Sequence, residues 1–106
     1  MIMNEIFISQ FFSEKGDLSH SIDEYRVRQE QIDISILIDE AITHKKKLIV
    51  EAGTGIGKTF AYLVPAFLSG GKIIISTATK NLQDQLFTKD IPMIRDALKV
   101  PVSLAM

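Results

Sequence analysis

The feature that most restricts how this chain can fold is an eight-residue loop, residues 52–59, with the sequence Ala-Gly-Thr-Gly-Ile-Gly-Lys-Thr. A short apolar run, residues 48–50, precedes the loop, and a helix-compatible stretch, residues 60–63, follows it. This context is typical of a phosphate-binding loop, with Ala52 where the strict pattern has its first glycine. The alternative is a glycine-rich turn followed by a chance Lys-Thr pair, and the strand and helix patterns on both sides favour the phosphate loop.

Each residue type in the loop has a physical role. Glycines allow the backbone to wrap a polyphosphate with its N–H groups pointing inward. A helix that starts near Gly57 adds the positive end of its dipole. We expect Lys58 to reach the β- and γ-phosphates and the Thr59 hydroxyl to ligate Mg²⁺.

Length and composition limit the possible classes of protein. The 106 residues suffice for one small domain at most, and the 46% hydrophobic content is ordinary for a globular fold. Twelve basic against thirteen acidic side chains give a net charge of −1, which provides no global basic field but leaves a local basic groove possible. The absence of Cys excludes disulfides and thiolate-bound metals within the segment. Without a long apolar run or a signal peptide, we expect a soluble cytoplasmic protein with no membrane partner.

Before the loop, the apolar spacing predicts an N-terminal helical lead-in within residues 1–24, followed by a helix over residues 29–43. Residues 36–41 also look like a Walker B strand, an apolar run whose terminal Asp39 and Glu40 would hold Mg²⁺. Apolar residues at helical spacing oppose that reading, and so does the hairpin that it would require, because a phosphate-loop sheet is parallel. We therefore expect Asp39 and Glu40 on or near a solvated helix face, and residues 45–47, all Lys, as a charged helix end rather than a nucleic-acid patch.

The pattern around and after the loop predicts an α/β fold. Residues 48–51 form the first expected strand, and the β-branched run at 72–77 forms a second strand, buried in a parallel sheet. Residues 100–106 are the expected start of a third. Between and after the first two strands we expect helices at 59–69, 81–88 and 90–98. Pro65 should kink or shorten the first of these helices.

Finer features of the last two helices can also be predicted. Thr79 is a plausible N-cap for the helix at 81–88, which should turn Leu82, Leu86 and Phe87 inward. Asp90 and the proline after it suit an acidic cap and first turn for the helix at 90–98.

The sequence lacks a second Mg²⁺ ligand after the loop. Phosphoryl transfer usually takes an Asp from the end of a neighbouring strand and a carboxylate that positions water. The acidic residues after Thr59 are Asp84, Asp90 and Asp96, and none follows an apolar strand. We therefore expect the chain to be the front part of a larger ATPase.

Several segments together resemble the N-terminal end of the XPD-like helicases of superfamily 2, particularly the bacterial DinG/YoaA branch. The phosphate loop preceded by Glu51 is typical of that branch, and the resemblance covers nearly the whole chain. The other matching segments are Tyr25-x-x-Arg28-x-x-Gln31, which resembles the Q-motif; Ile75 to Leu86, which resembles motif Ia; and Phe11-Phe12-Ser13-x-x-Gly16-x-Leu18, which is similar to the start of these proteins.

The resemblance implies a partial RecA-like domain, made of parallel strands flanked by helices and incomplete at its C-terminus, over residues 25–106. The implied activity couples ATP hydrolysis to unwinding or translocation on single-stranded DNA, in repair or replication. Lys58 and Thr59 would be catalytic, and Thr59 would bind Mg²⁺. The implied ATP-binding residues are Arg28, Gln31, Ala52, Gly53, Thr54, Gly55, Ile56, Gly57, Lys58 and Thr59.

Two of the implied roles have simpler alternatives. Arg28 and Gln31 would lie near the adenine or the phosphate loop, where a Gln amide can pair with a donor and an acceptor; without the resemblance, Gln31 is an exposed helix residue. Thr77, Ala78 and Thr79 would approach the phosphates of single-stranded DNA without reading bases. The alternative for Thr77 and Thr79 is strand-end and helix-cap duty, which is compatible with DNA contact.

The family continues into a four-Cys iron–sulfur insertion, an acidic Mg²⁺ motif and a second RecA-like domain. This segment has no Cys and no acidic motif after the loop, so the iron–sulfur cluster and the remainder of the helicase chain would be supplied from outside it. We expect the 106 residues alone neither to hydrolyse ATP at a helicase rate nor to unwind DNA. One alternative is a small phosphate-loop kinase or nucleotide-binding module. A kinase would need an Arg-rich lid region after the loop, and Arg95 is the single arginine there, which argues against it. Another alternative is a truncated, non-catalytic fragment that binds a partner through a sheet edge.

Overall fold

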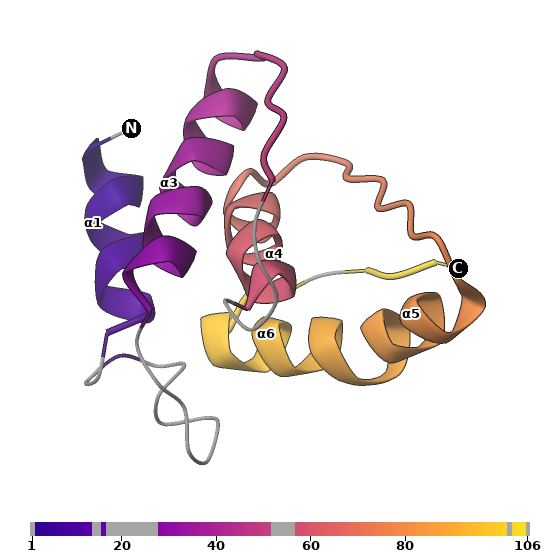
Figure 1. Ribbon diagram of the computed structural model, residues 1–106. Helices are drawn as coiled ribbons and strands as arrows, with labels where there is room; N and C mark the ends of the chain where they lie inside the picture. The colour runs from indigo at the N-terminus through magenta and orange to yellow at the C-terminus, as the bar shows by residue number, and fades with distance from the viewer. Residues whose placement is uncertain (1, 14–15, 17–27, 52–56, 102, 106) are drawn as a thin grey trace.

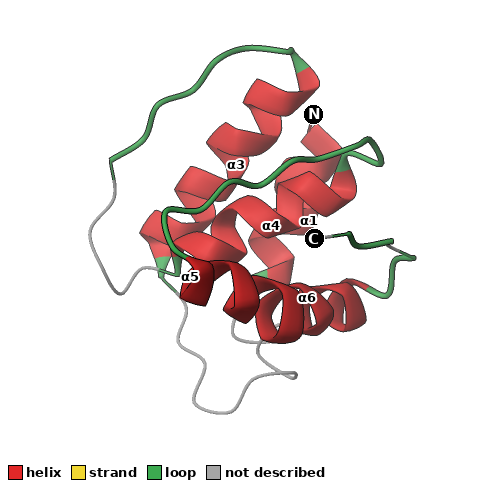
Figure 2. Cartoon of the chain, turned by 90° about the vertical axis from the view of Figure 1, so that its right-hand side faces the viewer, coloured by secondary structure: helices red, strands yellow, loops and turns green. Residues whose placement is uncertain are grey.

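The computed structural model describes residues 2–13, 16, 28–51, 57–101 and 103–105. Three helices stand side by side: α1 (Ile2–Phe11), α3 (Gln29–Thr43) and α4 (Lys58–Leu68). A second helical row, α5 (Lys80–Gln85), the π-turn η1 (Leu86–Asp90) and α6 (Ile91–Leu98), crosses below α4 (Figure 1). Figure 2 shows the same arrangement from the side, with the segment 69–79 running from the end of α4 to the start of α5.

The core lies where these helices meet. α3 packs along α4, α1 packs on both, and α6 packs on α4. Phe11 and Phe12 at the end of α1 meet edge to face, with ring centroids 5.5 Å apart. The buried apolar side chains of this single cluster come from all these helices: Ile8, Phe11, Phe12, Ile32, Leu63, Val64, Leu86, Ile91, Ile94 and Ala97.

Helix α3 has the bounds that apolar periodicity predicts, residues 29–43. Residues 36–41 lie inside it, so the Walker B alternative is wrong. Glu40 is exposed as expected, but Asp39 is not, because α1 covers it. The Asn4 side-chain amide donates to Asp39 Oδ1 at 3.1 Å, which gives the buried carboxylate a partner. Lys45, Lys46 and Lys47 follow the helix end and are exposed, as the charged-end interpretation predicts.

Helix α4 begins at Lys58 and ends at Leu68, one residue earlier at each end than the sequence predicts. Pro65 lies inside it and is buried, and the helix continues for three residues beyond it. The expected shortening is therefore absent. Ala61, Leu63 and Val64 are buried, which makes α4 the centre of the core.

The predicted helix at 90–98 is present as α6, with a proline in its first turn, but no break separates it from the helix before it. Helical structure continues through residues 80–98, with a π-turn at 86–90 that precedes Pro92. Asp90 has right-handed helical dihedrals and caps no backbone N–H with its side chain, so its interpretation as an acidic cap is wrong. Leu86 is buried, as predicted, whereas Leu82 is 50% exposed, because the first turn of the row extends beyond the core.

The expected parallel strands do not form among the described residues. Segments 48–51 and 72–77, and the described part of 100–106, run without strand pairing. A strand needs a neighbour to take its backbone hydrogen bonds, and these segments do not pair with one another. Ile49 is 97% exposed and Ile74 is 95% exposed, although both were expected in a covered sheet. The described part of the chain is therefore helical, and the predicted α/β class is only partly realised.

Candidate functional site

The described part of the phosphate loop is its final turn, Gly57, Lys58 and Thr59; Ala52, Gly53, Thr54, Gly55 and Ile56 lie outside the described residues. Gly57 is the N-cap of α4 and has φ 76° and ψ 47°, a left-handed conformation that favours glycine. Its carbonyl accepts the first helical bond, from the Ala61 N–H at 3.1 Å. The loop thus enters the helix at the point that the sequence predicts.

Gln31 contacts the end of this loop. Its side-chain amide donates from Nε2 to the Gly57 carbonyl oxygen at 3.1 Å, so that this oxygen accepts two hydrogen bonds. Gln31 is 1% exposed, so the alternative of an exposed helix residue is wrong. A Cβ on Gly57 would overlap the Gln31 amide nitrogen, which is a second reason for glycine at this position.

Arg28 lies one helical turn before Gln31, at the N-cap of α3. It has an extended backbone with φ −129° and ψ 120°, and its carbonyl accepts the N–H groups of Gln31 and Ile32 at 3.1 and 3.3 Å. Its side chain makes no capping bond and is partly exposed. The structure therefore places Gln31 on the phosphate loop and Arg28 at the start of the same helix.

Thr59, the expected Mg²⁺ ligand, is followed by Tyr62 in the same helix. The two side chains lie one turn apart on α4. Burial raises the pKa of the Tyr62 phenol, the neighbouring Thr59 hydroxyl lowers it, and the Asp90 carboxylate raises it further. Lys58, the expected phosphate-binding cation, is exposed.

Asp90 is a buried carboxylate that sequence reasoning did not assign to the site. It is 6% exposed, and its Oδ2 accepts a hydrogen bond from Gln85 Nε2 at 3.4 Å. Burial raises the pKa of Asp90, while the Gln85 bond and the nearby Lys89 charge partly offset that increase. The sequence shows an Asp before Ile-Pro, which is the pattern of a helix start, so only the structure reveals that this side chain is buried.

The expected DNA-contacting loop, Thr77 to Thr79, stands at the head of α5. Thr79 Oγ1 accepts the Leu82 N–H at 3.2 Å, which confirms the predicted N-cap. Thr77 Oγ1 donates to the Thr79 carbonyl at 3.1 Å. Ala78 and Thr79 are exposed, and Thr77 is partly exposed. Both hydroxyls have local structural roles, and contact with DNA stays a prediction.

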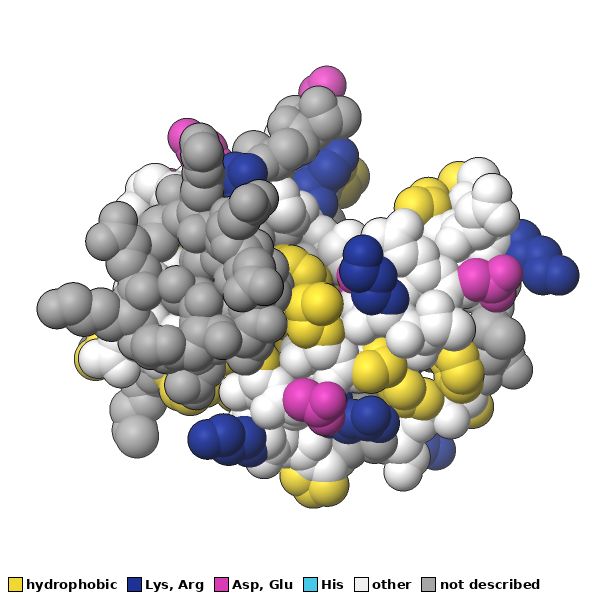
Figure 3. Space-filling model, turned by 90° about the horizontal axis from the view of Figure 1, so that it is seen from below, with side chains coloured by type: hydrophobic (Ala, Val, Ile, Leu, Met, Phe, Trp, Pro, Cys, Tyr) yellow, Lys and Arg dark blue, Asp and Glu magenta, His cyan; other side chains and the backbone are white. Residues whose placement is uncertain are grey.

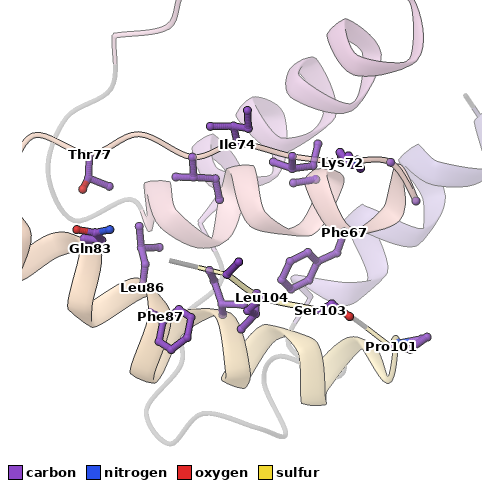
Figure 4. Close-up of a pocket in the computed structure, with 17 residues that line it drawn as sticks. Phe67, Lys72, Ile74, Thr77, Gln83, Leu86, Phe87, Pro101, Ser103 and Leu104 are labelled. Carbon is purple, nitrogen blue, oxygen red and sulfur yellow. The ribbon is translucent and has the colours of Figure 1, made fainter.

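A cavity of about 690 Å³ lies between the extended segment 72–75, the second helical row and the C-terminal segment. Phe67, Leu86 and Leu104 line it from three parts of the chain (Figure 4). Of the predicted site residues that the structure describes, Thr77 borders it, and Gly57, Lys58 and Thr59 do not. The cavity lies below a segment that was expected to be part of a sheet.

The charged side chains on one face of the molecule are dispersed. Viewed from below, Lys and Arg side chains are interspersed with Asp and Glu (Figure 3), in keeping with a net charge of −1. Within the described ranges, no cluster of three or more His, Asp or Glu side chains could hold a metal ion. None of the described helices is both long and apolar enough to cross a membrane.

Known proteins similar to this chain are named as helicases or as DinG proteins. The chain is 50% identical over 99 residues to the ATP-dependent DNA helicase YoaA of Haemophilus influenzae, covering 93% of the chain and 16% of that protein. It is 42% identical to the YoaA helicase of Escherichia coli, over 90% of the chain and 15% of that protein. It is 37% identical to the 3'-5' exonuclease DinG of Bacillus subtilis, over 83% of the chain and 10% of that protein.

These relatives confirm the resemblance to the DinG/YoaA branch, although the chain spans only about a sixth of the length of the YoaA proteins. No solved structure matches the chain. The profile of the DEAD/DEAH box helicases matches residues 32–105, which include the phosphate loop, α4 and the whole second helical row. The chain belongs to the DEAD/DEAH box helicase family.

Proposed function

We propose that this chain supplies the ATP-binding loop of an ATP-dependent DNA helicase that couples ATP hydrolysis to unwinding or translocation on single-stranded DNA. The YoaA relatives carry the name ATP-dependent DNA helicase, which supports this activity, and a role in repair or replication fits the same branch. In the intact helicase the remaining catalytic groups come from sequence outside these residues. The 106 residues alone bind nucleotide without hydrolysing it at a helicase rate.

The observation that carries the proposal is the bond between Gln31 and Gly57. An amide that is 1% exposed reaches across from α3 to the last glycine of the phosphate loop. That contact joins the two segments that the helicase resemblance assigns to ATP, although they are 26 positions apart. A generic glycine-rich turn gives no reason for a buried amide to be held against it.

The proposed roles follow from the chemistry of each group. Lys58 neutralises the β- and γ-phosphates, and Thr59 ligates Mg²⁺. Gln31 and Arg28 lie toward the nucleotide, and the loop at 77–79 contacts the phosphates of single-stranded DNA. The phosphate contacts of the loop are assigned to the backbone of Ala52, Gly53, Thr54, Gly55 and Ile56.

The proposed organisation places a helical lead-in at 1–24 and the first part of a RecA-like domain at 25–106. In the intact helicase, segments 48–51 and 72–77 pair with neighbouring parallel strands, which cover Ile49 and Ile74. An iron–sulfur cluster would need thiolates from elsewhere, because these residues include no Cys. The protein acts in the cytoplasm, with ATP, single-stranded DNA and the rest of the helicase as partners.

The test is a nucleotide titration of the 106-residue chain. Lys58→Ala should abolish measurable MgATP binding in calorimetry, because it removes the cation that is expected to meet the γ-phosphate. The control is Lys47→Ala, which removes an exposed cation after α3 and should leave binding unchanged. Equal affinities for Lys58→Ala and the unsubstituted chain would refute the phosphate-loop assignment.

A further inference from the structure

Helix α3 buries a row of polar side chains. Gln31, Ser35 and Asp39 follow one another at intervals of four residues and are 1%, 0% and 4% exposed. Residues at this spacing share one side of a helix. Displaced from this row round the helix are four apolar side chains at helical spacing that are half-buried or exposed: Ile34, Leu37, Ile38 and Ala41. This arrangement is the reverse of the usual division between a buried apolar face and an exposed polar one.

Hydrophobic burial alone does not decide which side of α3 faces the rest of the molecule. The buried side also carries Ile32, which belongs to the core cluster, so apolar side chains lie on more than one side of the helix. The hydrophobic effect is non-directional and proportional to the apolar area that is buried. The rotation of α3 about its axis is therefore fixed by directional contacts, namely hydrogen bonds.

The polar row has such a contact at each end. At one end, Gln31 Nε2 donates to the Gly57 carbonyl oxygen of the phosphate loop at 3.1 Å. About two helical turns further along, Asp39 Oδ1 accepts a hydrogen bond from Asn4 Nδ2 of α1, also at 3.1 Å. Helix α3 stands beside both α1 and α4 and packs on each of them (Figure 1). Because α3 is continuous between the two contacts, a bond that stops it from turning at Asp39 also sets the direction of Gln31.

Ser35, in the middle of the row, shows that this side of α3 is not arranged for stability alone. Its hydroxyl oxygen is buried and has no hydrogen-bond partner within the described residues. Burying a hydroxyl without a partner costs free energy, and an alanine at this position would avoid that cost. The burial of the polar row is therefore unfavourable at Ser35, which favours a positioning role for the row over a packing role.

We propose that Asn4 and Asp39 are positioning residues: their hydrogen bond sets the rotation of α3 and so holds the Gln31 amide against the phosphate loop. This inference rests on the proposed function, which assigns Gln31 to the nucleotide site. Asn4 and Asp39 do not touch the nucleotide and act through Gln31. Helix α1 lies before the residues that match the helicase profile, 32–105, and it thereby becomes part of the framework of the nucleotide site.

The experiment separates stability from MgATP affinity in the 106-residue chain. Asn4→Leu combined with Asp39→Leu removes both hydrogen-bond partners and keeps the site filled, so the free energy of unfolding should stay the same or rise. The same double variant should bind MgATP about three- to tenfold more weakly, which is the effect of losing one hydrogen bond. Urea denaturation and calorimetry measure the two quantities.

Two further variants are the controls. Asp39→Asn keeps an oxygen that can accept the Asn4 bond, so its MgATP affinity should equal that of the unsubstituted chain. Asp33→Leu removes a carboxylate from the exposed side of the same helix, where it accepts a hydrogen bond from Gln29 Nε2 at 2.8 Å. This matched loss of an amide–carboxylate bond should leave MgATP affinity unchanged, because it does not fix the rotation of α3.

The Gln31 side-chain amide provides a measurement that needs no nucleotide. Its NMR signals are identified by their disappearance in Gln31→Ala. The signals should be protected from exchange with water in the unsubstituted chain and in Asp39→Asn, and should lose that protection in the double Leu variant. If the double variant does not fold, Asn4→Ala, which removes the donor from a partly exposed position, decides by the same signals.

The possible outcomes are distinguishable. Protected Gln31 signals in the double Leu variant would overturn the inference, and so would unaltered MgATP affinity in that variant. Parallel losses of stability and affinity that Asp39→Asn shares would show a structural role and overturn it as well. If the unsubstituted chain does not bind MgATP, the proposed function fails, and the amide signals still decide whether Asn4 and Asp39 position Gln31.

Discussion

Helices α3 and α4 bury their apolar faces against each other, whereas segments 48–51 and 72–77 expose side chains of the same chemical type. Leu63 of α4 is fully buried, while Ile74 is 95% exposed. The difference lies in where the backbone finds its hydrogen bonds. A helix satisfies its own N–H and C=O groups and needs a neighbour only for one face, but a strand needs a neighbour along its whole edge.

The largest expected effect tests the buried side of this comparison. Leu63→Ala removes a side chain from the centre of the core and should lower the free energy of unfolding by about 2–5 kcal/mol. Ile74→Ala removes an equal number of carbon atoms from an exposed position and should change that free energy by about 0.5 kcal/mol or less. Urea denaturation followed by circular dichroism measures both. Similar losses would mean that segment 72–77 packs in solution more closely than it does here.

The next effect separates backbone strain from side-chain contact at the loop. Gly57 and Gly70 both have left-handed dihedrals, with φ 76° and 71°, but a Cβ at Gly70 would meet no atom within 4 Å. Gly70→Ala should therefore cost only the strain, about 1 kcal/mol. Gly57→Ala should cost more and should also weaken ATP binding, because the new methyl group displaces the Gln31 amide.

A double substitution sharpens that result. If the new methyl group at position 57 collides with the Gln31 amide, then Gly57→Ala should lower the free energy of unfolding by less when Gln31 is already replaced by Ala. A double-mutant cycle on unfolding free energies measures this difference. Equal costs at Gly57 and Gly70 in the presence of Gln31 would contradict the contact.

The smallest expected effect concerns Asp90 and depends on pH. Burial raises the pKa of Asp90 above its ordinary value of 3.8, so the folded chain binds this proton more tightly than the unfolded chain. The contribution of protonated Asp90 to the free energy of unfolding is therefore present at low pH, and it is lost as the pH rises through the pKa of Asp90 in the folded chain. At pH 7, Asp90→Asn should raise the unfolding temperature by roughly 2–4 °C.

The advantage of Asp90→Asn should disappear below about pH 4, where both side chains are neutral. Tyr62 also titrates nearby, but its raised pKa keeps that titration at alkaline pH. Thermal unfolding by circular dichroism between pH 3 and pH 8 measures the effect. An advantage that is independent of pH would mean that the charge of Asp90 is not the cause.

The features that the sequence predicts well are local. Apolar periodicity gives α3 its exact bounds and places α4 within one residue, and the cap at Thr79 depends on residues three positions apart. The burial of Asp39 depends on Asn4, 35 positions away, so helical periodicity alone placed it on the wrong face. The strands predicted at 48–51 and 72–77 depend in the same way on distant residues, because the sequence of a segment does not say which other segment it pairs with.

In the candidate site, too, local features could be predicted from the sequence, and features that depend on distant contacts could not. The motif identifies Gly57, Lys58 and Thr59 without any structure, and the resemblance assigns Gln31 to the adenine or the phosphate loop. The structure adds the contact of Gln31 with the Gly57 carbonyl, and a contact with adenine stays a prediction. Asp90 and the proline after it correctly indicated the start of α6, but the π-turn before it has no simple sequence pattern, so the burial of Asp90 was not predicted.

The bond from Gln31 has an entropic consequence for ligand binding. Glycine can adopt more backbone conformations than any other residue type, so ordering Gly57 when a phosphate binds would cost conformational entropy. The Gln31 amide and the first turn of α4 already restrict Gly57 in the absence of nucleotide. Part of the conformational entropy cost of forming the phosphate site is therefore incurred during folding, and less of the binding free energy is spent on it later.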